Sequence, residues 1–397
     1  MNRRAHALAL LALAELLGMS VWFSASALAP QLKAAWSLSD VQAGWLSSAV
    51  QLGFVAGTAT AALLNLADII PSRTYFGLSA LAAGACNAAL LAAGGFVPAL
   101  LTRFGVGFFL AGVYPPAMKM VATWYRDGRG FAIGTVVGAL TVGKATPFLV
   151  HGLEHAGLAP VVLLASAASA AAGLLVLTAY RDGPYAFERR PFDWHLVGTV
   201  LRHREVRLAT SGYLGHMWEL YAMWTWIAAF LAAGAGLSPR GADLAGFAAI
   251  AVGGAGCVVG GILADRHGRE RLTIWAMALS GACAAVVGLT ASAPGVVVAV
   301  AVVWGFAVVA DSAQFSALVT ELAPAHAVGT ALTLQTSLGF LLTMASIQLV
   351  PHLVGAVGWR WAFVALAFGP AAGIAAMRRL QRLRAMARPP APAPRGW

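Results

Sequence analysis

The chain has 397 residues, of which 60% are hydrophobic and only 10% are charged. Soluble proteins carry roughly a quarter charged residues, so this composition excludes a water-soluble globular domain and indicates a chain that lives in a lipid bilayer. Its net charge of +11 does not indicate a nucleic-acid partner, because the basic residues lie between apolar segments and at the chain ends, not on one soluble face.

Apolar segments long enough to cross a bilayer, about 20 residues each, recur along the whole chain. The first follows Met1-Asn2-Arg3-Arg4 and shows no obvious signal-peptide cleavage site, so we read it as a retained helix. In the first half, the predicted membrane helices cover residues 6–29, 41–66, 74–94, 97–123, 130–151 and 159–180. In the second half, they cover residues 206–234, 241–263, 272–292, 295–321, 327–355 and 359–380. We therefore expect an all-α membrane protein with 12 transmembrane helices in two six-helix bundles.

The remaining segments suggest how these bundles, residues 1–180 and 206–380, are connected and oriented. Residues 181–205 are rich in arginine and acidic residues and are expected to form a linker. Residues 381–397 combine arginine with a Pro-Ala run and are predicted to be a disordered tail. Arginine gathers beside both ends and the linker, and flanking positive charges stay in the cytoplasm. This pattern predicts a multi-pass protein of the inner membrane with both termini cytoplasmic.

Short patterns recur between the two halves. The first predicted helix carries Glu15-Leu16-x-x-Met19-x-x-Trp22, and the seventh carries Glu219-Leu220-x-x-Met223-x-x-Trp226. The same spacing separates Pro147-Phe148-Leu149-Val150 from Pro351-His352-Leu353-Val354, and a weaker echo pairs Gly107-Phe108 with Gly305-Phe306. Matches of helix n with helix n+6 predict two parallel six-helix repeats that are related by duplication.

Ionisable residues inside membrane helices are costly and by default suggest function. Glu15, Met19, Trp22 and Ser26 are spaced to share one helical face, and Tyr213 and His216 precede Glu219 at helical spacing, with Trp226 following it. Burial can change the proton affinity of a carboxyl group, so Glu15 and Glu219 are candidates for proton coupling. Alternatively, each carboxylate only forms hydrogen bonds with a neighbouring helix. Asp311 is a third acid within an apolar segment, and a structural role is open for it as well.

Two cations also lie within apolar segments. Arg103 and Lys144 could balance these acids or bind an anionic substrate, since guanidinium and ammonium groups recognise carboxylates and phosphates. For Lys144 the alternative is a side chain that extends to the membrane surface. Its counterpart at the repeat spacing is Gln348, which implies an asymmetric site.

A loop motif suggests the family. Gly261-Ile-Leu-Ala-Asp265-Arg266-His-Gly268-Arg269-Glu270-Arg271 resembles the loop signature of the major facilitator superfamily (MFS), and a degraded copy with Asp68 and Arg73 lies in the first half. The resemblance implies a gating role for Gly261, Asp265, Arg266, Gly268, Arg269, Asp68 and Arg73. The stretch from Arg103 to Gly130 resembles branches that include anion:cation symporters, organophosphate antiporters and nitrate or cyanate porters.

This resemblance implies a monomeric secondary transporter with the MFS fold and alternating access. We expect it to be proton-coupled, to move a small solute, with an anion as the favoured class, and to use no cofactor or metal. A multidrug/proton antiporter for amphipathic compounds is the alternative within the fold, because Trp22 and Trp226 are compatible with a wide aromatic cavity. A membrane-embedded enzyme that uses His216 with Glu219, or His151, is a remote alternative.

Overall fold

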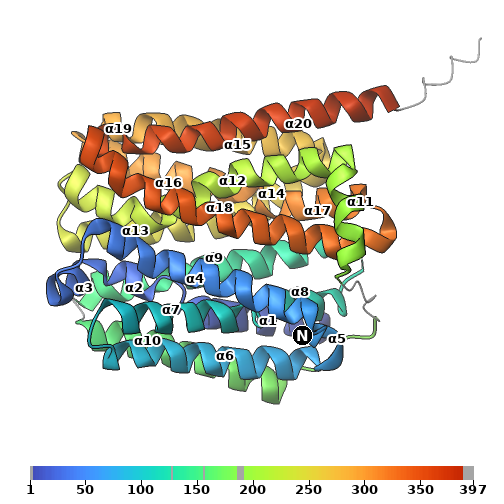
Figure 1. Ribbon diagram of the computed structural model, residues 1–397, viewed down its shortest axis with the longest axis horizontal. Coiled ribbons are helices and arrows are strands. Elements are labelled where there is room, and N and C mark those ends of the chain that lie inside the picture. Colours follow the sequence, from blue (N-terminus) through green and yellow to red (C-terminus); the bar gives the residue numbers. More distant parts are fainter. Residues whose placement is uncertain (1–2, 127, 155–156, 186–191, 388–397) are drawn as a thin grey trace, which may run out of the picture.

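The computed structural model describes residues 3–126, 128–154, 157–185 and 192–387. These residues form two stacked bundles of long helices, with the N-terminal half below the C-terminal half in Figure 1. The helices of the N-terminal half are α1 (Arg3–Met19), α2 (Ser24–Ala27), α3 (Ala29–Trp36), α4 (Asp40–Leu63), α5 (Leu66–Ile69), α6 (Ser72–Ala88), η1 (Ala89–Ala92), α7 (Phe96–Leu110), α8 (Tyr114–Ala122), α9 (Arg129–Glu154) and α10 (Leu158–Ala179).

Two short elements, η2 (Trp194–Leu196) and α11 (Val197–Arg202), lie within the predicted linker, residues 181–205, and lead into the second bundle. The C-terminal half consists of α12 (Arg204–Ala229), η3 (Phe230–Gly234), α13 (Pro239–Ala251), α14 (Gly253–His267), α15 (Arg269–Val286), η4 (Val287–Thr290), α16 (Pro294–Ala310), α17 (Ser312–Leu322), η5 (Ala325–Ala327), α18 (Val328–Val357), α19 (Trp359–Ala362), η6 (Phe363–Ala367) and α20 (Phe368–Ala387). The predicted all-α fold class is thereby confirmed for the described residues.

Ten helical segments of the described chain are long and apolar enough to cross a membrane. These ten segments match ten of the twelve predicted spans. The other two predicted spans, the first and the seventh, correspond to α1–α3 and to α12. Helix α1 is shortened by a break after Met19, and α12 has charged residues in its first turn and a polar stretch in its middle. The first span has the same position in the N-terminal bundle as α12 has in the C-terminal bundle. This arrangement is consistent with twelve membrane-spanning segments.

The two halves pack in the same way. In the N-terminal half, α1 lies against α9 and α10, α4 against α7, and α6 against α10. In the C-terminal half, α12 lies against α18 and α20, α13 and α14 against α16, and α15 against α20. Each contact therefore has a counterpart six spans later, as duplicated bundles require.

One pair of glycines makes this correspondence specific. A Cβ atom on Gly107 would lie 2.0 Å from the carbonyl oxygen of Val50, and one on Gly305 would lie 1.6 Å from that of Ala249. Neither distance leaves room for a side chain, so both glycines permit close contact between two helix backbones. The weak sequence echo between Gly107 and Gly305 thus reflects the same close contact in each half.

The first span differs from the prediction of one continuous helix. Helix α1 ends at Met19, and the chain passes through a turn in which the amides of Ser20 and Trp22 donate to the carbonyls of Leu17 and Met19. Helical spacing therefore does not extend to Ser26, and the prediction of one face through that residue is wrong. In the second copy, α12 runs without interruption past Trp226.

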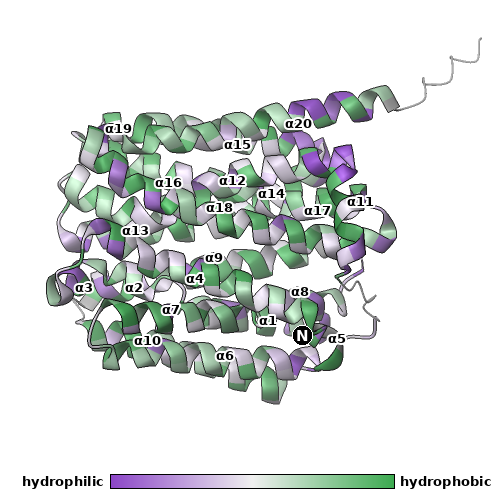
Figure 2. Cartoon of the chain, in the orientation of Figure 1, coloured by the Kyte–Doolittle hydropathy of each residue, from purple (hydrophilic) through white to green (hydrophobic). Residues whose placement is uncertain are grey.

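The chain ends lie at the same end of the molecule. The start of α1 and the far end of α20 both lie at the right of Figure 1, and polar residues gather at this end around α11 and α20 in Figure 2. Helix α20 continues to Ala387, which corrects the predicted boundary of an unstructured tail at residue 381. Residues 388–397, and residues 186–191 of the predicted linker, lie outside the described part of the chain.

Candidate functional site

Aromatic side chains from both halves meet between the two bundles. The ring of Trp22 lies 5.5 Å from that of Phe54 and 5.7 Å from that of Tyr221, between ring centroids. Phe340 lies 4.6 Å from Phe54, and Trp224 lies 5.2 Å from Tyr221. All five rings are buried. We call these rings, together with the lysine that they surround, the central cluster: Trp22, Phe54, Lys144, Tyr221, Trp224 and Phe340.

Lys144 projects from α9 into this cluster and is only 3% exposed. Its Nζ donates a hydrogen bond of 2.6 Å to the hydroxyl oxygen of Tyr221. The same nitrogen lies 3.9 Å from the ring centroid of Trp22 and 5.4 Å from that of Trp224. Cation–π contacts contribute about 2 kcal/mol when they are desolvated. The ammonium group is therefore held inside the protein, and the alternative of a side chain extending to the membrane surface does not apply.

Glu15 lies beside this lysine, at the point where α1 and α9 touch. A Cβ atom on Gly143 would lie 2.2 Å from the carbonyl oxygen of Leu16, so the residues next to Lys144 and Glu15 are in backbone contact. Glu15 is fully buried and interacts electrostatically with Lys144. Neither of its carboxylate oxygens has a hydrogen-bond partner among the described residues. Buried polar groups are nearly always hydrogen-bonded, so this carboxylate is the exceptional acid of the structure.

Arg103 forms hydrogen bonds with the backbone of the first span. The guanidinium group is fully buried on α7, and NH2 donates to the carbonyl oxygens of Val21 and Trp22 at 3.0 and 2.5 Å. NH1 donates to the Oγ of Ser24 and the Oδ1 of Asn87. These carbonyls belong to the turn after α1, where helical partners are missing. Arg103 thus stabilises the break in the first span, and the structure does not place it on the acids or in the central cluster.

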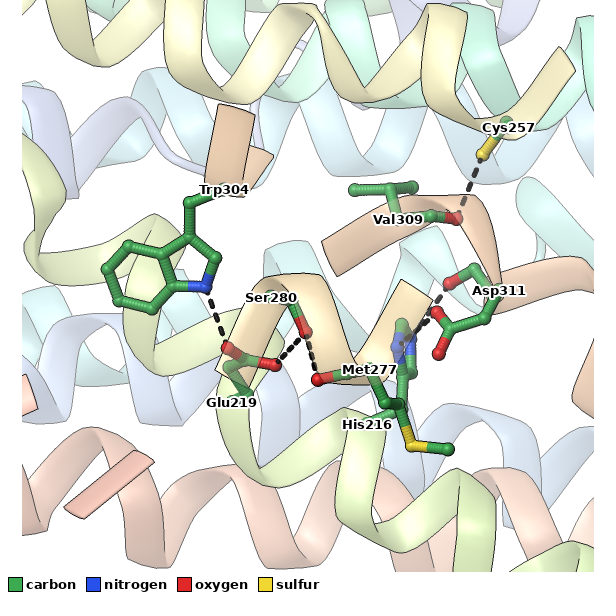
Figure 3. Close-up of polar contacts among 9 residues, drawn as sticks. His216, Glu219, Cys257, Met277, Ser280, Trp304, Val309 and Asp311 are labelled. Carbon is green, nitrogen blue, oxygen red and sulfur yellow. Dashed lines mark hydrogen bonds and ion pairs between the residues drawn. The ribbon is translucent and has the colours of Figure 1, made fainter. Parts of the chain in front are cut away.

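Glu219 is enclosed within the C-terminal bundle (Figure 3). Its Oε1 accepts a hydrogen bond of 2.7 Å from the indole nitrogen of Trp304 on α16, and its Oε2 accepts one of 2.8 Å from the hydroxyl of Ser280 on α15. The residue is 1% exposed. The two carboxylates of the repeat therefore have different environments, and Glu219 forms hydrogen bonds with neighbouring helices of its own bundle.

His216 and Asp311 form a second polar pair in the same bundle. The Nδ1 atom of His216 lies 2.9 Å from Oδ1 of Asp311, and its Nε2 atom lies 2.9 Å from the hydroxyl oxygen of Ser312. Figure 3 shows this pair beside Glu219 and below Cys257, whose sulfur donates to the carbonyl of Val309. Asp311 lies at the break between α16 and α17. These residues connect α12 with the broken tenth span.

We expect Glu219→Gln to lower stability more than transport. The amide nitrogen would place a donor against Trp304 or Ser280, both of which now donate to the carboxylate. Loss of a charge-assisted hydrogen bond costs roughly 1.5–3 kcal/mol. Thermal unfolding of the purified variant measures the effect. An unfolding temperature of Glu219→Gln equal to that of the wild type would contradict this assignment. So would a variant of normal stability that has lost proton-driven uptake.

The loop motif lies where α14 of one half meets α9 of the other. Gly261, Asp265 and Arg266 end α14, Gly268 has a φ of 91°, and Arg269 begins α15. The Oδ2 atom of Asp265 lies 3.6 Å from the Cβ position of Gly130, beside the first turn of α9, where a helix favours negative charge. In the first half, Arg73 lies in α6, and the side chain of Asp68 lies outside the described part.

Arg269 acts within its own half. Its Nε donates to Glu321 at 2.7 Å, and its NH1 donates to Gln314 at 2.6 Å. Both partners lie on α17. Among the described contacts, the motif therefore reaches the other bundle through Asp265 and Gly261, which both lie against Gly130 of α9.

The opposite ends of the bundles are also in contact. The Nδ1 atom of His151 on α9 lies 2.6 Å from the carboxylate of Asp243 on α13, and the side-chain amide of Gln348 on α18 forms a hydrogen bond with the hydroxyl of Ser48 on α4. The indole nitrogen of Trp226 donates to the carbonyl of Ile347, so Trp226 supports this region from within its own half. The two halves are thus joined on both sides of the central cluster.

Sequence reasoning identified Lys144, Trp22 and Trp224 of the central cluster, and Glu15 beside it, but it did not identify Phe54, Tyr221 and Phe340. Tyr221 follows Glu219 by two residues and was overlooked because helical spacing places it off the face that the repeat defines. Phe54 and Phe340 look like ordinary core residues in apolar helices. Their packing across the two halves is a tertiary property that no single-helix pattern contains.

Known proteins share this architecture. A solved bacterial homolog of the human lysosomal transporter Spinster, in an inward-facing and unoccupied conformation, aligns with 98% of this chain and 100% of its own, at a TM-score of 0.74 and 17% identity. The nucleoside transporter NupG, as its D323A mutant, aligns with 94% of this chain and 99% of its own, at a TM-score of 0.73 and 13% identity. At these identities the likeness shows the fold alone. No curated protein sequence matched the chain.

The sequence itself also matches a family model. The model of the Major Facilitator Superfamily covers residues 10–347, which include the first span, the central cluster and the Asp265 loop. The matching family points to a transporter rather than an enzyme. The chain therefore belongs to the Major Facilitator Superfamily and is a multi-pass membrane transporter.

Proposed function

We propose that this protein is a secondary active transporter that couples the movement of a small anionic solute to protons by alternating access. The observation that carries the proposal is the buried Glu15 carboxylate, which has no hydrogen-bond partner among the described residues and interacts electrostatically with Lys144, the lysine that reaches Tyr221 of the other half. A group that is poorly satisfied by the protein can take up and release a proton as its surroundings change.

Charge balance gives these two residues a coupling mechanism. In the empty carrier, ionised Glu15 neutralises the ammonium of Lys144, which is also held by Tyr221. In the loaded carrier, a protonated Glu15 leaves Lys144 free to pair with the anion. The charges of Glu15, Lys144 and any bound anion therefore sum to zero in the empty carrier and in the loaded carrier. A carrier with only the proton or only the anion would bury an uncompensated charge, which costs several kcal/mol. Only the empty and the fully loaded carrier are then able to close.

The gating contacts fit a rocking motion of two bundles. The Asp265 contact with the start of α9 joins the halves at the end that carries both chain termini, and the His151–Asp243 contact joins them at the other. We propose that these contacts break in turn as the central cluster opens to each side. The arginine-rich end is assigned to the cytoplasm of an inner membrane, and the monomer is proposed as the working unit.

A second candidate is a proton-driven exporter of amphipathic compounds. The aromatic rings of the central cluster favour it, because an aromatic cage that already holds the ammonium of Lys144 is also suited to a cationic drug. The two proposals differ in the sign of the substrate charge. An anion would pair with Lys144, whereas a cation would have to displace it.

The test replaces Glu15 by glutamine. In proteoliposomes with an acidic exterior, we expect the wild type to accumulate at least one of the radiolabelled anions methanesulfonate, benzenesulfonate, nitrate and phosphate, together with protons that a trapped dye reports. Because glutamine resembles the protonated acid, Glu15→Gln is expected to retain exchange of the labelled for unlabelled anion but to lose proton-driven accumulation.

Glu219→Gln is the matched control, since Glu219 is a buried acid on the equivalent span with two hydrogen-bond donors. It should keep proton-driven accumulation. If no anion enters the wild-type vesicles, or if Glu15→Gln still accumulates the anion against its gradient, the proposal is wrong. Proton-driven export of benzyltrimethylammonium by the wild type would instead support the exporter.

A further inference from the structure

Several polar atoms around the central cluster are buried without a partner. Gln51 on α4 is fully buried, and neither its amide nitrogen nor its amide oxygen has a hydrogen-bond partner among the described residues. The indole nitrogens of Trp22 and Trp224 are also buried and unpartnered. Leaving such a donor unsatisfied costs about 1–3 kcal/mol each, and a native structure rarely gathers several in one place without a ligand for them.

Gln51 lies on the face of α4 that is turned toward the central cluster. The side chain of Ser48, one turn earlier, forms a hydrogen bond with the side-chain amide of Gln348 in the other half. Phe54, one turn later, packs against the ring of Trp22. Residues three apart share a helical face, so Gln51 lies between these two contacts. Gln51 therefore lies on the face of α4 that meets Trp22 and the other half.

The unpartnered groups define what a ligand must offer. The indole N–H groups and the ammonium of Lys144 are donors without acceptor capacity, and the amide of Gln51 can donate as well. A ligand that satisfies them needs acceptor oxygens and a negative charge. Lys144 supplies one buried positive charge here, because the other buried cation, Arg103, is engaged by the carbonyls of Val21 and Trp22. A dianion would leave one charge uncompensated.

The surroundings of this polar centre are flat and apolar. Trp22, Phe54, Tyr221 and Phe340 lie within 4.6–5.9 Å of one another, measured between the centroids of contacting rings. A ligand that binds between these rings must replace the ring–ring contacts that it breaks. A planar apolar body replaces them with similar contacts and therefore loses the least free energy. A compact inorganic anion has no apolar body and would replace none of these ring contacts.

Resting on the proposed function, we infer that the central cluster binds a monoanion with a flat, apolar body, such as an aromatic carboxylate or sulfonate. Its oxygens accept hydrogen bonds from Lys144 and the amide of Gln51, with the indole N–H groups of Trp22 and Trp224 as further donors. Its body lies among Trp22, Phe54, Tyr221 and Phe340. Gln51 determines specificity without contributing to the stability of the empty protein.

The experiment compares Gln51→Leu with Gln335→Leu. Leucine at position 51 removes an amide that has no partners, so thermal unfolding of the empty protein should occur at the same or a higher temperature. The KM for benzenesulfonate in proteoliposomes should rise at least tenfold. Gln335 on α18 is equally buried but donates to the carbonyl of Phe315. Gln335→Leu should therefore lower the unfolding temperature and leave that KM unchanged.

A competition series tests the ligand class on the wild type. Benzenesulfonate and 4-hydroxybenzoate should raise the unfolding temperature and compete with each other, whereas methanesulfonate, benzene-1,3-disulfonate and benzyltrimethylammonium should compete at least tenfold less well. Protein-free liposomes report passive entry of the carboxylic acid. An unchanged KM in Gln51→Leu, or equal competition by methanesulfonate or the disulfonate, overturns the inference.

These outcomes separate the two proposals. Proton-coupled uptake of methanesulfonate, nitrate or phosphate without any effect of benzenesulfonate leaves the proposed function intact and removes the ligand class. Failure of all anions in the wild type removes both. A lower unfolding temperature in Gln51→Leu would show that the amide has a structural role and would also overturn the inference.

Discussion

Replacing Lys144 by glutamine is expected to reduce anion uptake by about 100-fold or more. The ammonium is the charge that the proposed anion pairs with, and loss of a buried charged hydrogen bond of about 3 kcal/mol corresponds to roughly two orders of magnitude in affinity. The neutral side chain also removes the counter-charge of Glu15, which then remains buried beside it. Initial rates of labelled benzenesulfonate uptake in proteoliposomes measure the first effect, and thermal unfolding measures the second.

A double variant separates charge balance from binding. Glu15→Gln combined with Lys144→Gln leaves no buried charge at this pair, so its unfolding temperature should lie above that of Lys144→Gln alone. Uptake should stay low, because the anion still lacks its partner. Lys33→Gln is the control: Lys33 pairs with Asp40 in a contact that is largely exposed, and its loss should change neither property measurably. Normal uptake in Lys144→Gln would exclude the lysine from the substrate site.

Replacing Arg103 by methionine is expected to give the largest loss of stability of any single substitution considered. Four hydrogen bonds would disappear, two of them to carbonyl oxygens in the turn that interrupts the first span. A buried acceptor without a donor costs about 1–3 kcal/mol, so we expect a loss of at least about 3 kcal/mol. Thermal unfolding in detergent, with the amount of monodisperse protein recovered, measures it.

Two further variants give this prediction its specificity. Arg103→Lys keeps the charge but loses the fork of donors, and it should restore only part of the stability. Arg360→Met, at an exposed arginine that lies over the ring of Trp361, should leave the unfolding temperature nearly unchanged. If Arg103→Met were as stable as the wild type but failed to bind benzenesulfonate, the guanidinium would belong to the substrate site and not to the helix break.

The contrast between Arg103 and Lys144 shows where sequence reasoning stops. Both are cations in apolar helices, and the sequence offers the same two roles to each. The difference arises from neighbours in other spans: backbone carbonyls of the first span surround Arg103, and rings from both halves surround Lys144. Glu15 and Glu219 show the same effect. They are identical in local pattern, yet one has two donors and the other has none among the described residues.

The break after Met19 has a similar origin. Residues 15–26 carry a helical pattern with neither proline nor glycine after Met19, so local propensity predicts that the helix continues. Arg103, which is distant in sequence, captures the carbonyls that a continuous helix would use. A long-range hydrogen bond in a low-dielectric interior thereby outweighs local propensity.

The sequence by itself determined the class of this protein, since 60% hydrophobic residues in segments of bilayer length permit little other than a helical membrane protein. It also determined the duplication and the family, because repeated spacings and the Asp265 loop are local patterns. Only the tertiary structure decided which buried polar groups are satisfied. Hydrogen bonding and ion pairing inside the bundles depend on side chains from different spans, and these meet only when the helices pack.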